Sequence, residues 1–238
     1  MLKAVLLDFY GTLAETRDWG PSWEELVTEL GYTLPPDVRD RWWNDGIDGI
    51  EHDEHSQSRD HYIAWQRSRV RQIIEESGVP KGDDDILFSQ ITERLGSPDL
   101  YAFEDTKPVL DELRDRGLTL AICSNWDWDL LEAIENAGLT GAVDVVVSSA
   151  WVGARKPHPR MYADTLQRIG MEAADAIFVG DTWTCDVEGP RRFGMQPVYI
   201  RRAHYGVDYT APEGERPEDA DVVRTTDLNA LLELARTT

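Results

Sequence analysis

The chain has 238 residues, of which 41% are hydrophobic, enough for one ordinary domain or for a core with a modest second lobe. It carries 45 acidic residues against 24 basic ones, a formal net charge of −21. A field of this sign disfavours nucleic acid and anionic membranes as partners, because phosphate groups need basic residues on the protein. The charge is explained by an ordinary acidic surface or, as a sharper hypothesis, by adaptation to a cytoplasm of high salt.

The residues Met1-Leu2-Lys3 lead straight into a predicted strand, and no run of about eighteen or more apolar residues follows. We therefore expect no signal peptide, transit peptide or membrane span. The two cysteines, Cys123 and Cys185, lack the spacing of a paired motif and are expected to be reduced packing residues. These features predict a cytoplasmic protein, either a monomer or a homodimer.

The first predicted strand is the apolar run over residues 4–7, and it ends at Asp8. Ligands of open α/β sheets gather beyond the carboxyl ends of the strands, so Asp8 stands where a catalytic carboxylate would lie. Gly11 allows a sharp turn after the strand, and the Thr12 hydroxyl can fix the loop. Taken alone, this pattern fits an ordinary polar turn as well as a catalytic loop.

Residues 19–103 show helical patterns and no convincing strand. A capping-box sequence, Ser22-Trp23-Glu24-Glu25, opens the first helix. Three histidines, His52, His55 and His61, lie close together in sequence and could hold a metal ion, although solvated side chains explain them adequately. Helices are expected over residues 22–30, 37–44, 61–76 and 83–95.

Strands and helices alternate again from about residue 106 to the end of the chain, which predicts a doubly wound, mostly parallel α/β sheet. Polar residues end two of the buried strands: Ser124-Asn125 follows one, and Asp181 follows another, with Asp186 five residues later. Lys156 stands just before a predicted helix start. Strands are expected over residues 118–124, 143–147, 176–180 and 196–200, helices over 128–137, 159–169 and 190–194, and a last strand and helix between 220 and 235.

In chain order, Asp8, Ser124, Lys156 and the pair Asp181 and Asp186 resemble the four motifs of the haloacid dehalogenase superfamily. The resemblance runs from Lys3 to about Arg201 and omits only the middle segment. It implies a Rossmann-like catalytic core made of residues 1–14 and 105–238. It also implies a small α-helical cap domain, residues 15–104, that covers the active site and selects the substrate.

The resemblance also implies a role for each motif residue. Asp8 would be the nucleophile, which forms an aspartyl phosphate or an alkyl ester that water then hydrolyses. Mg²⁺ would be held by oxygen ligands, as that ion prefers, with Asp186 orienting a water or Lys156 rather than binding directly. The implied catalytic residues are Asp8, Tyr10, Ser124 and Lys156; the substrate-binding residues are Thr12, Ser124, Asn125 and Lys156; the metal-site residues are Asp8, the main-chain carbonyl of Tyr10, Asp181 and Asp186.

Tyr10 departs from the phosphatase pattern, which has a second aspartate there as general acid and base. The 2-haloacid dehalogenase branch resembles the chain at this position, with an Asp-x-Tyr-Gly-Thr stretch. A tyrosine fits dehalogenation, because halide leaves without a proton and a neutral carbon needs no metal. At the fourth motif the chain departs from that branch, which generally has serine and asparagine where this chain has Asp181 and Trp183. A dehalogenase also needs a cap arginine, for which Arg39 and Arg41 are candidates.

We therefore predict a Mg²⁺-dependent phosphatase that acts on a small anionic metabolite, with metal-independent 2-haloacid dehalogenation as the alternative. A non-catalytic member that binds a phosphorylated ligand or a partner protein is a further alternative. A redox or metal-storage role is disfavoured, because the chain has few cysteines.

Overall fold

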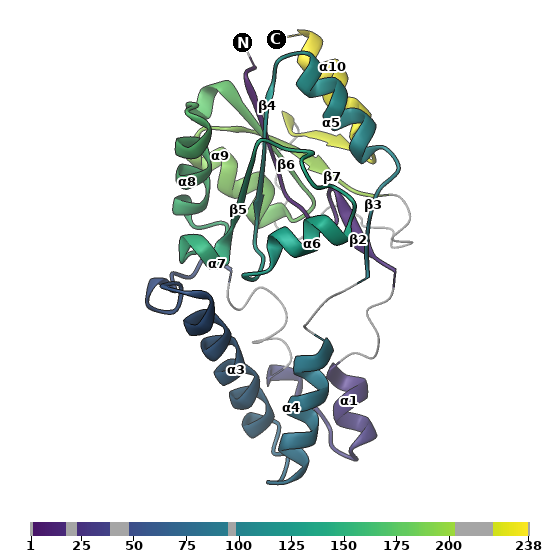
Figure 1. Ribbon diagram of the computed structural model, residues 1–238, viewed down its shortest axis with the longest axis vertical. Helices are drawn as coiled ribbons and strands as arrows, with labels where there is room; N and C mark the ends of the chain where they lie inside the picture. Colours follow the sequence, from purple (N-terminus) through teal and green to yellow (C-terminus); the bar gives the residue numbers. More distant parts are fainter. Residues whose placement is uncertain (1, 18–22, 39–47, 95–98, 203–220, 238) are drawn as a thin grey trace.

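The computed structural model describes residues 2–17, 23–38, 48–94, 99–202 and 221–237 (Figure 1). Short strands alternate with helices over most of this length. The strands are β1 (Ala4–Leu7), β2 (Ala14–Thr16), β3 (Leu100–Ala102), β4 (Thr119–Ser124), β5 (Val145–Ser148), β6 (Ala176–Gly180), β7 (Gln196–Ile200) and β8 (Val223–Thr225). The α-helices are α1 (Trp23–Glu29), α3 (Arg59–Glu76), α4 (Asp83–Arg94), α5 (Thr106–Asp115), α6 (Leu130–Asn136), α7 (Ser149–Val152), α8 (Pro159–Ile169), α9 (Gly189–Phe193) and α10 (Asn229–Thr237).

Six strands form one parallel sheet in the order β5-β4-β1-β6-β7-β8, with β1 between β4 and β6. Successive residues of β1 face opposite sides of the sheet. Val5 and Leu7 pack in the core shared with α5, α6 and α10, whereas Ala4 and Leu6 pack in the core shared with α8. The strand is buried on both faces, which is why it is apolar throughout. The expected doubly wound α/β fold is confirmed.

Helices α1, α3 and α4 pack against one another in a separate apolar cluster that includes Leu26, Val70, Ile74 and Leu87. They lie together at one end of the core, opposite the two chain termini (Figure 1). We call residues 15–104 the insert. Three of its four expected helices are present, and the fourth, over residues 37–44, lies largely outside the described residues.

The expectation that residues 19–103 contain no strand is wrong. Strand β3 pairs antiparallel with β2, placing Thr16 opposite Leu100 and Ala14 opposite Ala102. This two-stranded ribbon forms the junction between core and insert (Figure 1). Each strand has three residues, too few for the alternation of apolar and polar residues that marks a strand in a sequence.

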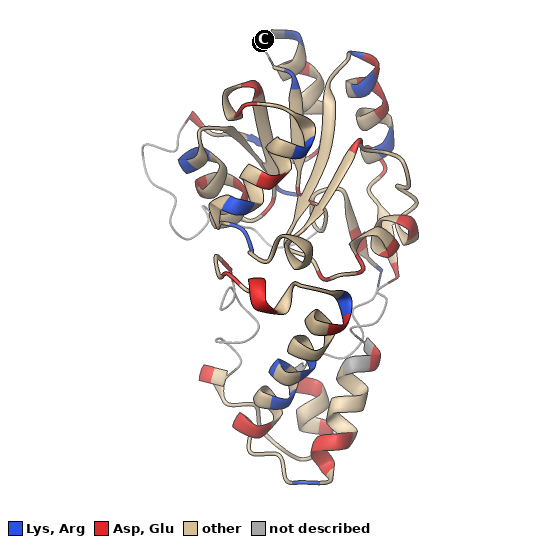
Figure 2. Ribbon diagram, turned by 60° about the vertical axis from the view of Figure 1, so that its left-hand side comes forward, with Lys and Arg blue, Asp and Glu red and all other residues tan. Residues whose placement is uncertain are grey.

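Two further elements were not expected from the sequence: the short helix α7 and a π-helical turn, η3 (Trp183–Glu188), directly after β6. Acidic residues are spread over both the core and the insert rather than gathered on one element (Figure 2). Within the described ranges, no helix combines the length and the apolar character needed to cross a membrane.

Candidate active site

Three adjacent strands bring the predicted site residues together. Asp8 follows β1, Ser124 ends β4 and Asp181 follows β6. The pairing places Leu7 opposite Ile122 on one side and opposite Val179 on the other, so the three strands end at one level. The chain adds strands first on one side of β1 and then on the other, and ligands of open α/β sheets bind at such a switch point.

Lys156 bridges two carboxylates at these strand ends. Its Nζ atom donates hydrogen bonds of 2.7 Å to Oδ1 of Asp8 and 2.7 Å to Oδ1 of Asp186. The Ser124 hydroxyl donates to the same Asp8 oxygen at 3.0 Å. All four side chains are buried, and Lys156 is only 1% exposed. A buried lysine requires such partners, because an unpaired charge away from water is costly.

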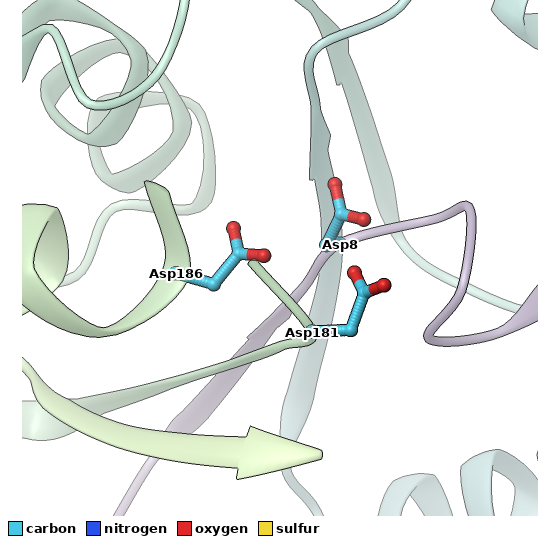
Figure 3. A group of neighbouring side chains, drawn as sticks. All are labelled: Asp8, Asp181 and Asp186. Atoms are coloured by element: carbon cyan, nitrogen blue, oxygen red, sulfur yellow. The ribbon is translucent and has the colours of Figure 1, made fainter. Parts of the chain in front are cut away.

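Asp8, Asp181 and Asp186 point toward one another from the ends of β1 and β6 and from the π-helical turn η3 (Figure 3). Each supplies a carboxylate oxygen, and these oxygens lie within 4.8 Å of one another. Two glycines leave room for the carboxylates of Asp181 and Asp186 to lie this close to the strand ends. A Cβ atom on Gly11, which has a φ of +77°, would lie 2.2 Å from Oδ2 of Asp181, and one on Gly180 would lie 2.3 Å from Cγ of Asp186.

The π-helical turn η3 directs Asp186 back toward the strand ends. The Asp186 amide donates to the carbonyl of Thr182 at 2.7 Å, and the Thr182 amide donates to Oδ2 of Asp186 at 2.9 Å. Each oxygen of this carboxylate therefore has a donor, the Thr182 amide on one side and Lys156 on the other. π-Helical turns are rare and are often found at functional sites.

The electrostatics of the site follow from three acids and one base in a buried space. Burial, with the nearby charges of Asp8 and Asp186, raises the pKa of Asp181 well above its usual value. Burial and Asp8 raise the pKa of Asp186 to about 7, against the opposing effect of Lys156. Burial alone would lower the pKa of Lys156, but Asp186 and Asp8 raise it well above its usual value.

This donor set fits a hard divalent cation such as Mg²⁺. All of its ligand atoms are oxygens, and the one lysine leaves two of the three carboxylates without a balancing charge. In the part of the chain that the structure describes, this is the one group of acidic, histidine or cysteine side chains arranged to hold a metal. His52 and His55 instead stack on the Trp65 ring, with ring centroids 4.9 Å apart in both cases.

Asn125 fixes the main chain of Lys156 from both sides. Its Oδ1 accepts from the Lys156 amide at 2.6 Å, and its Nδ2 donates to the Lys156 carbonyl at 2.9 Å. The predicted contact of Asn125 with substrate stays a prediction, since its amide is engaged within the protein here.

The other predicted residues are placed less directly. The Thr12 side chain is buried and its hydroxyl has no hydrogen-bond partner among the described residues, while the Thr12 carbonyl accepts from Arg202. Tyr10 is half-buried, with its ring 6.3 Å from the ring of Trp126. Arg39 and Arg41 lie outside the described residues.

The structure adds a residue that the sequence did not single out. Asp48, on the insert, accepts a 2.9 Å hydrogen bond from Asn125 and lies beside Cys185. Asp48 stands in a glycine-containing loop, far in sequence from its partners, and no local pattern marks such a long-range contact.

The known proteins that this chain resembles include both phosphatases and a dehalogenase. The family model for haloacid dehalogenase-like hydrolases matches residues 2–194. The chain is 35% identical over 138 residues to haloacid dehalogenase-like hydrolase domain-containing protein 3 of Mus musculus, covering 57% of this chain and 55% of that protein, about half of its length. It is 26% identical to the ribulose-1,5-bisphosphate 5-phosphatase of Halopiger xanaduensis over 83% of this chain and 84% of that one.

It is also 32% identical to haloacetate dehalogenase H-2 of a Moraxella species, over 87% of this chain and 89% of that one. The crystal structure of a haloacid dehalogenase phosphatase from Thermococcus onnurineus has the same fold, with a TM-score of 0.60 and 23% identity over 98% of this chain and 97% of that chain. The family match covers all three strand ends that carry the site and the buried lysine. The chain therefore belongs to the haloacid dehalogenase-like hydrolases.

Proposed function

We propose that this hydrolase is a Mg²⁺-dependent phosphatase that acts on a small anionic phosphorylated metabolite, with Asp8 as its nucleophile. The observation that carries the proposal is the convergence of Asp8, Asp181 and Asp186 around a single lysine. Three carboxylates this close together, two of them buried, repel one another unless a cation lies among them. Haloalkanoate hydrolysis at a neutral carbon has no need of such a cluster.

The contacts around Asp8 suit nucleophilic attack on phosphorus. One Asp8 oxygen is held by Lys156 and Ser124, which leaves the other to form the bond to phosphorus as the bond to the leaving oxygen breaks. Water then hydrolyses the aspartyl phosphate at phosphorus and regenerates the carboxylate. Lys156 and Ser124 also supply a positive charge and a hydroxyl donor for the oxygens of the transferred group.

Asp8 and Asp181 would hold the Mg²⁺ ion, with Asp186 adjacent and the Tyr10 carbonyl as the further ligand implied by the family. When bound, the ion would neutralise charge on the carboxylates and on the phosphoryl group. The leaving oxygen needs a proton, and Tyr10 is a weak acid for that purpose, since phenols have a pKa of about 10. The weak acidity of Tyr10 favours substrates whose leaving groups depart without a proton.

The second candidate activity is hydrolysis of 2-haloalkanoates. Two observations favour it: Tyr10 in the first loop, and 32% identity to the Moraxella haloacetate dehalogenase over most of both chains. There the Asp8 carboxylate would displace halide from carbon to form an ester. Water would then cleave this ester, releasing the hydroxy acid.

One panel of assays distinguishes the two activities. The protein is incubated with p-nitrophenyl phosphate, alkyl and sugar phosphates, and 2-chloro- and 2-bromopropionate, each in EDTA and in MgCl₂. Phosphate release that requires Mg²⁺ supports the proposal, and halide release that continues in EDTA establishes the alternative. Asp8→Asn should abolish either activity, and substantial turnover in this variant would contradict Asp8 as the nucleophile.

A further inference from the structure

Residues 48–55 of the insert lie along the core segment that leads into Lys156. The Gly49 amide donates to the Lys156 carbonyl at 3.1 Å, and the Arg155 amide donates to the Ile50 carbonyl at 3.0 Å. An isolated antiparallel bridge pairs Glu51 with Ala154. The insert is thus attached by main-chain hydrogen bonds to the loop that carries the buried lysine.

The Asp48 side chain contacts three loops, which are the segments that contain Ser124, Lys156 and Asp186. Its Oδ1 accepts from Nδ2 of Asn125 at 2.9 Å and lies 3.5 Å from Nε of Arg155. Its Oδ2 accepts from the Cys185 thiol at 3.3 Å. The side chain is 18% exposed, so these interactions are largely shielded from water.

Each of these partners is the sequence neighbour of a residue assigned to the reaction. Asn125 follows Ser124, Arg155 precedes Lys156, and Cys185 precedes Asp186. Two of the partners also share an acceptor, because the Cys185 thiol and the Asn125 amide both lie at hydrogen-bonding distance from the Lys156 carbonyl. One carboxylate from the insert therefore holds together the loops that position the hydroxyl, the ammonium and the second carboxylate.

We propose that Asp48 is a positioning residue, which aligns Ser124, Lys156 and Asp186 only when the insert is seated on the core. The inference rests on the roles given to those three residues under the proposed function. Under this proposal, the insert supports the catalytic residues in addition to its expected role of covering the active site. Groups held through a supporting contact of this kind typically lose about 10- to 100-fold in function when the support is removed.

The chain offers a matched control on the same segment. Asp53 also fastens the insert to the core, through two hydrogen bonds of 2.6 Å to Arg160, but its side chain is exposed and these bonds go to α8 rather than to Asn125, Arg155 or Cys185. A residue that only anchors the insert should behave like Asp53. A residue that positions the catalytic loops should not.

The first measurement compares Asp48→Ala and Asp53→Ala with p-nitrophenyl phosphate and Mg²⁺. Asp48→Ala should lower kcat about 10- to 100-fold with little change in KM, whereas Asp53→Ala should leave kcat near the wild-type value. Because Asp48 acts through Asn125, Asn125→Ala should lower kcat by a smaller factor in the Asp48→Ala background than in the wild type. Equal effects of the two aspartate variants, or additive effects with Asn125→Ala, would overturn the proposal.

The second measurement does not depend on the reaction. Amide hydrogen exchange should accelerate in peptides containing Asn125, Lys156 and Cys185 in Asp48→Ala, and in Asp53→Ala only around residue 53 itself. Unchanged exchange of the three loops in Asp48→Ala would overturn the inference. If the wild type hydrolyses neither p-nitrophenyl phosphate nor 2-chloropropionate, the proposed function fails, while the exchange data still decide whether Asp48 holds the loops. Asp48→Asn, which keeps the shape of the side chain, serves if the alanine variant does not fold.

Discussion

The Nζ atom of Lys156 lies 2.7 Å from Oδ1 of Asp8 in a site where both side chains are buried. The same nitrogen is equally close to Oδ1 of Asp186, so one ammonium group is shared between two carboxylates. Removal of one member of a buried ion pair is more damaging than loss of the whole pair, because a charge is left without compensation. We therefore expect Lys156 to stabilise the fold in addition to its proposed role in binding the transferred group.

Lys156→Met should lower the free energy of unfolding by about 3 kcal/mol or more at pH 8, in the absence of metal. The loss should be smaller at pH 5, because the carboxyls can then take up protons instead of remaining charged. Urea unfolding at both pH values measures the difference. Lys107→Met, on the exposed face of α5, is the matched control and should change little. Equal losses for the two variants would contradict the role of Lys156 as the charge partner.

Asp181→Asn should have opposite effects with and without metal. A carboxyl whose folded pKa is raised loses stability as the pH rises above its unfolded value of 3.8, so the neutral amide should make the apo protein more stable at pH 8. The wild type should gain about 2.7 kcal/mol when free Mg²⁺ is 100-fold above its Kd, and the variant should gain much less. Thermal unfolding with and without MgCl₂ tests both, with Asp111→Asn as an exposed control. Identical Mg²⁺ effects in all three proteins would refute the assignment of Asp181.

The residues at the strand ends can be predicted from the sequence because their signals are local. An apolar run that stops at Asp8 or at Ser124 marks both a buried strand and the edge where ligands bind. Asp48 could not be found in this way, since its contacts with Asn125 and Cys185 span 77 and 137 residues of sequence. The π-helical turn at 183–188 was missed for a related reason, because its hydrogen-bond register is set by packing and has no residue pattern of its own.

His52 should give the stability of the fold a dependence on pH. Its ring is buried at the junction of insert and core, and this burial, together with the charge of Arg155, lowers its pKa to about 4. An unfolded histidine titrates near 6.5, so between these values the unfolded chain binds more protons. The stabilisation is present above pH 6.5 and is lost as the pH falls toward 4.

Urea unfolding of the wild type and His52→Gln across this range should show a shallower loss of stability in the variant. His61→Gln, at an exposed position of α3, should follow the wild type. Parallel curves for the wild type and His52→Gln would show that His52 takes up its proton equally in both states.

The net charge of −21 predicts a response to salt. Repulsion between carboxylates spread over core and insert destabilises the compact state, and dissolved ions screen it. The melting temperature should rise from low salt to molar KCl. A control in molar sucrose separates screening from general exclusion of the solute, which also stabilises folded proteins. A melting temperature that is constant or falls with KCl would show that the surface ion pairs outweigh the repulsion.

Tyr10 sets the last expectation, which concerns the leaving group. A phosphatase without a carboxylic acid at this position should hydrolyse aryl and acyl phosphates far faster than alkyl or sugar phosphates. The reason is that aryl and acyl leaving groups depart with little help from a proton. Tyr10→Asp should then raise the hydrolysis of alkyl phosphates by up to about 10²-fold, the low end of general acid catalysis, and leave aryl phosphates nearly unchanged. The gain is limited because a new carboxylate near Asp8 adds repulsion.

Kinetics with p-nitrophenyl phosphate and a matched alkyl phosphate, each in MgCl₂, measure the two effects in the same preparation. Tyr10→Phe is the control, since it removes the phenol without adding an acid, and its ratio of aryl to alkyl turnover should stay at the wild-type value. If the wild type hydrolyses both substrates at equal rates, another group donates the proton to the leaving oxygen. A drop in alkyl turnover alone in Tyr10→Phe would show that the phenol itself is that donor.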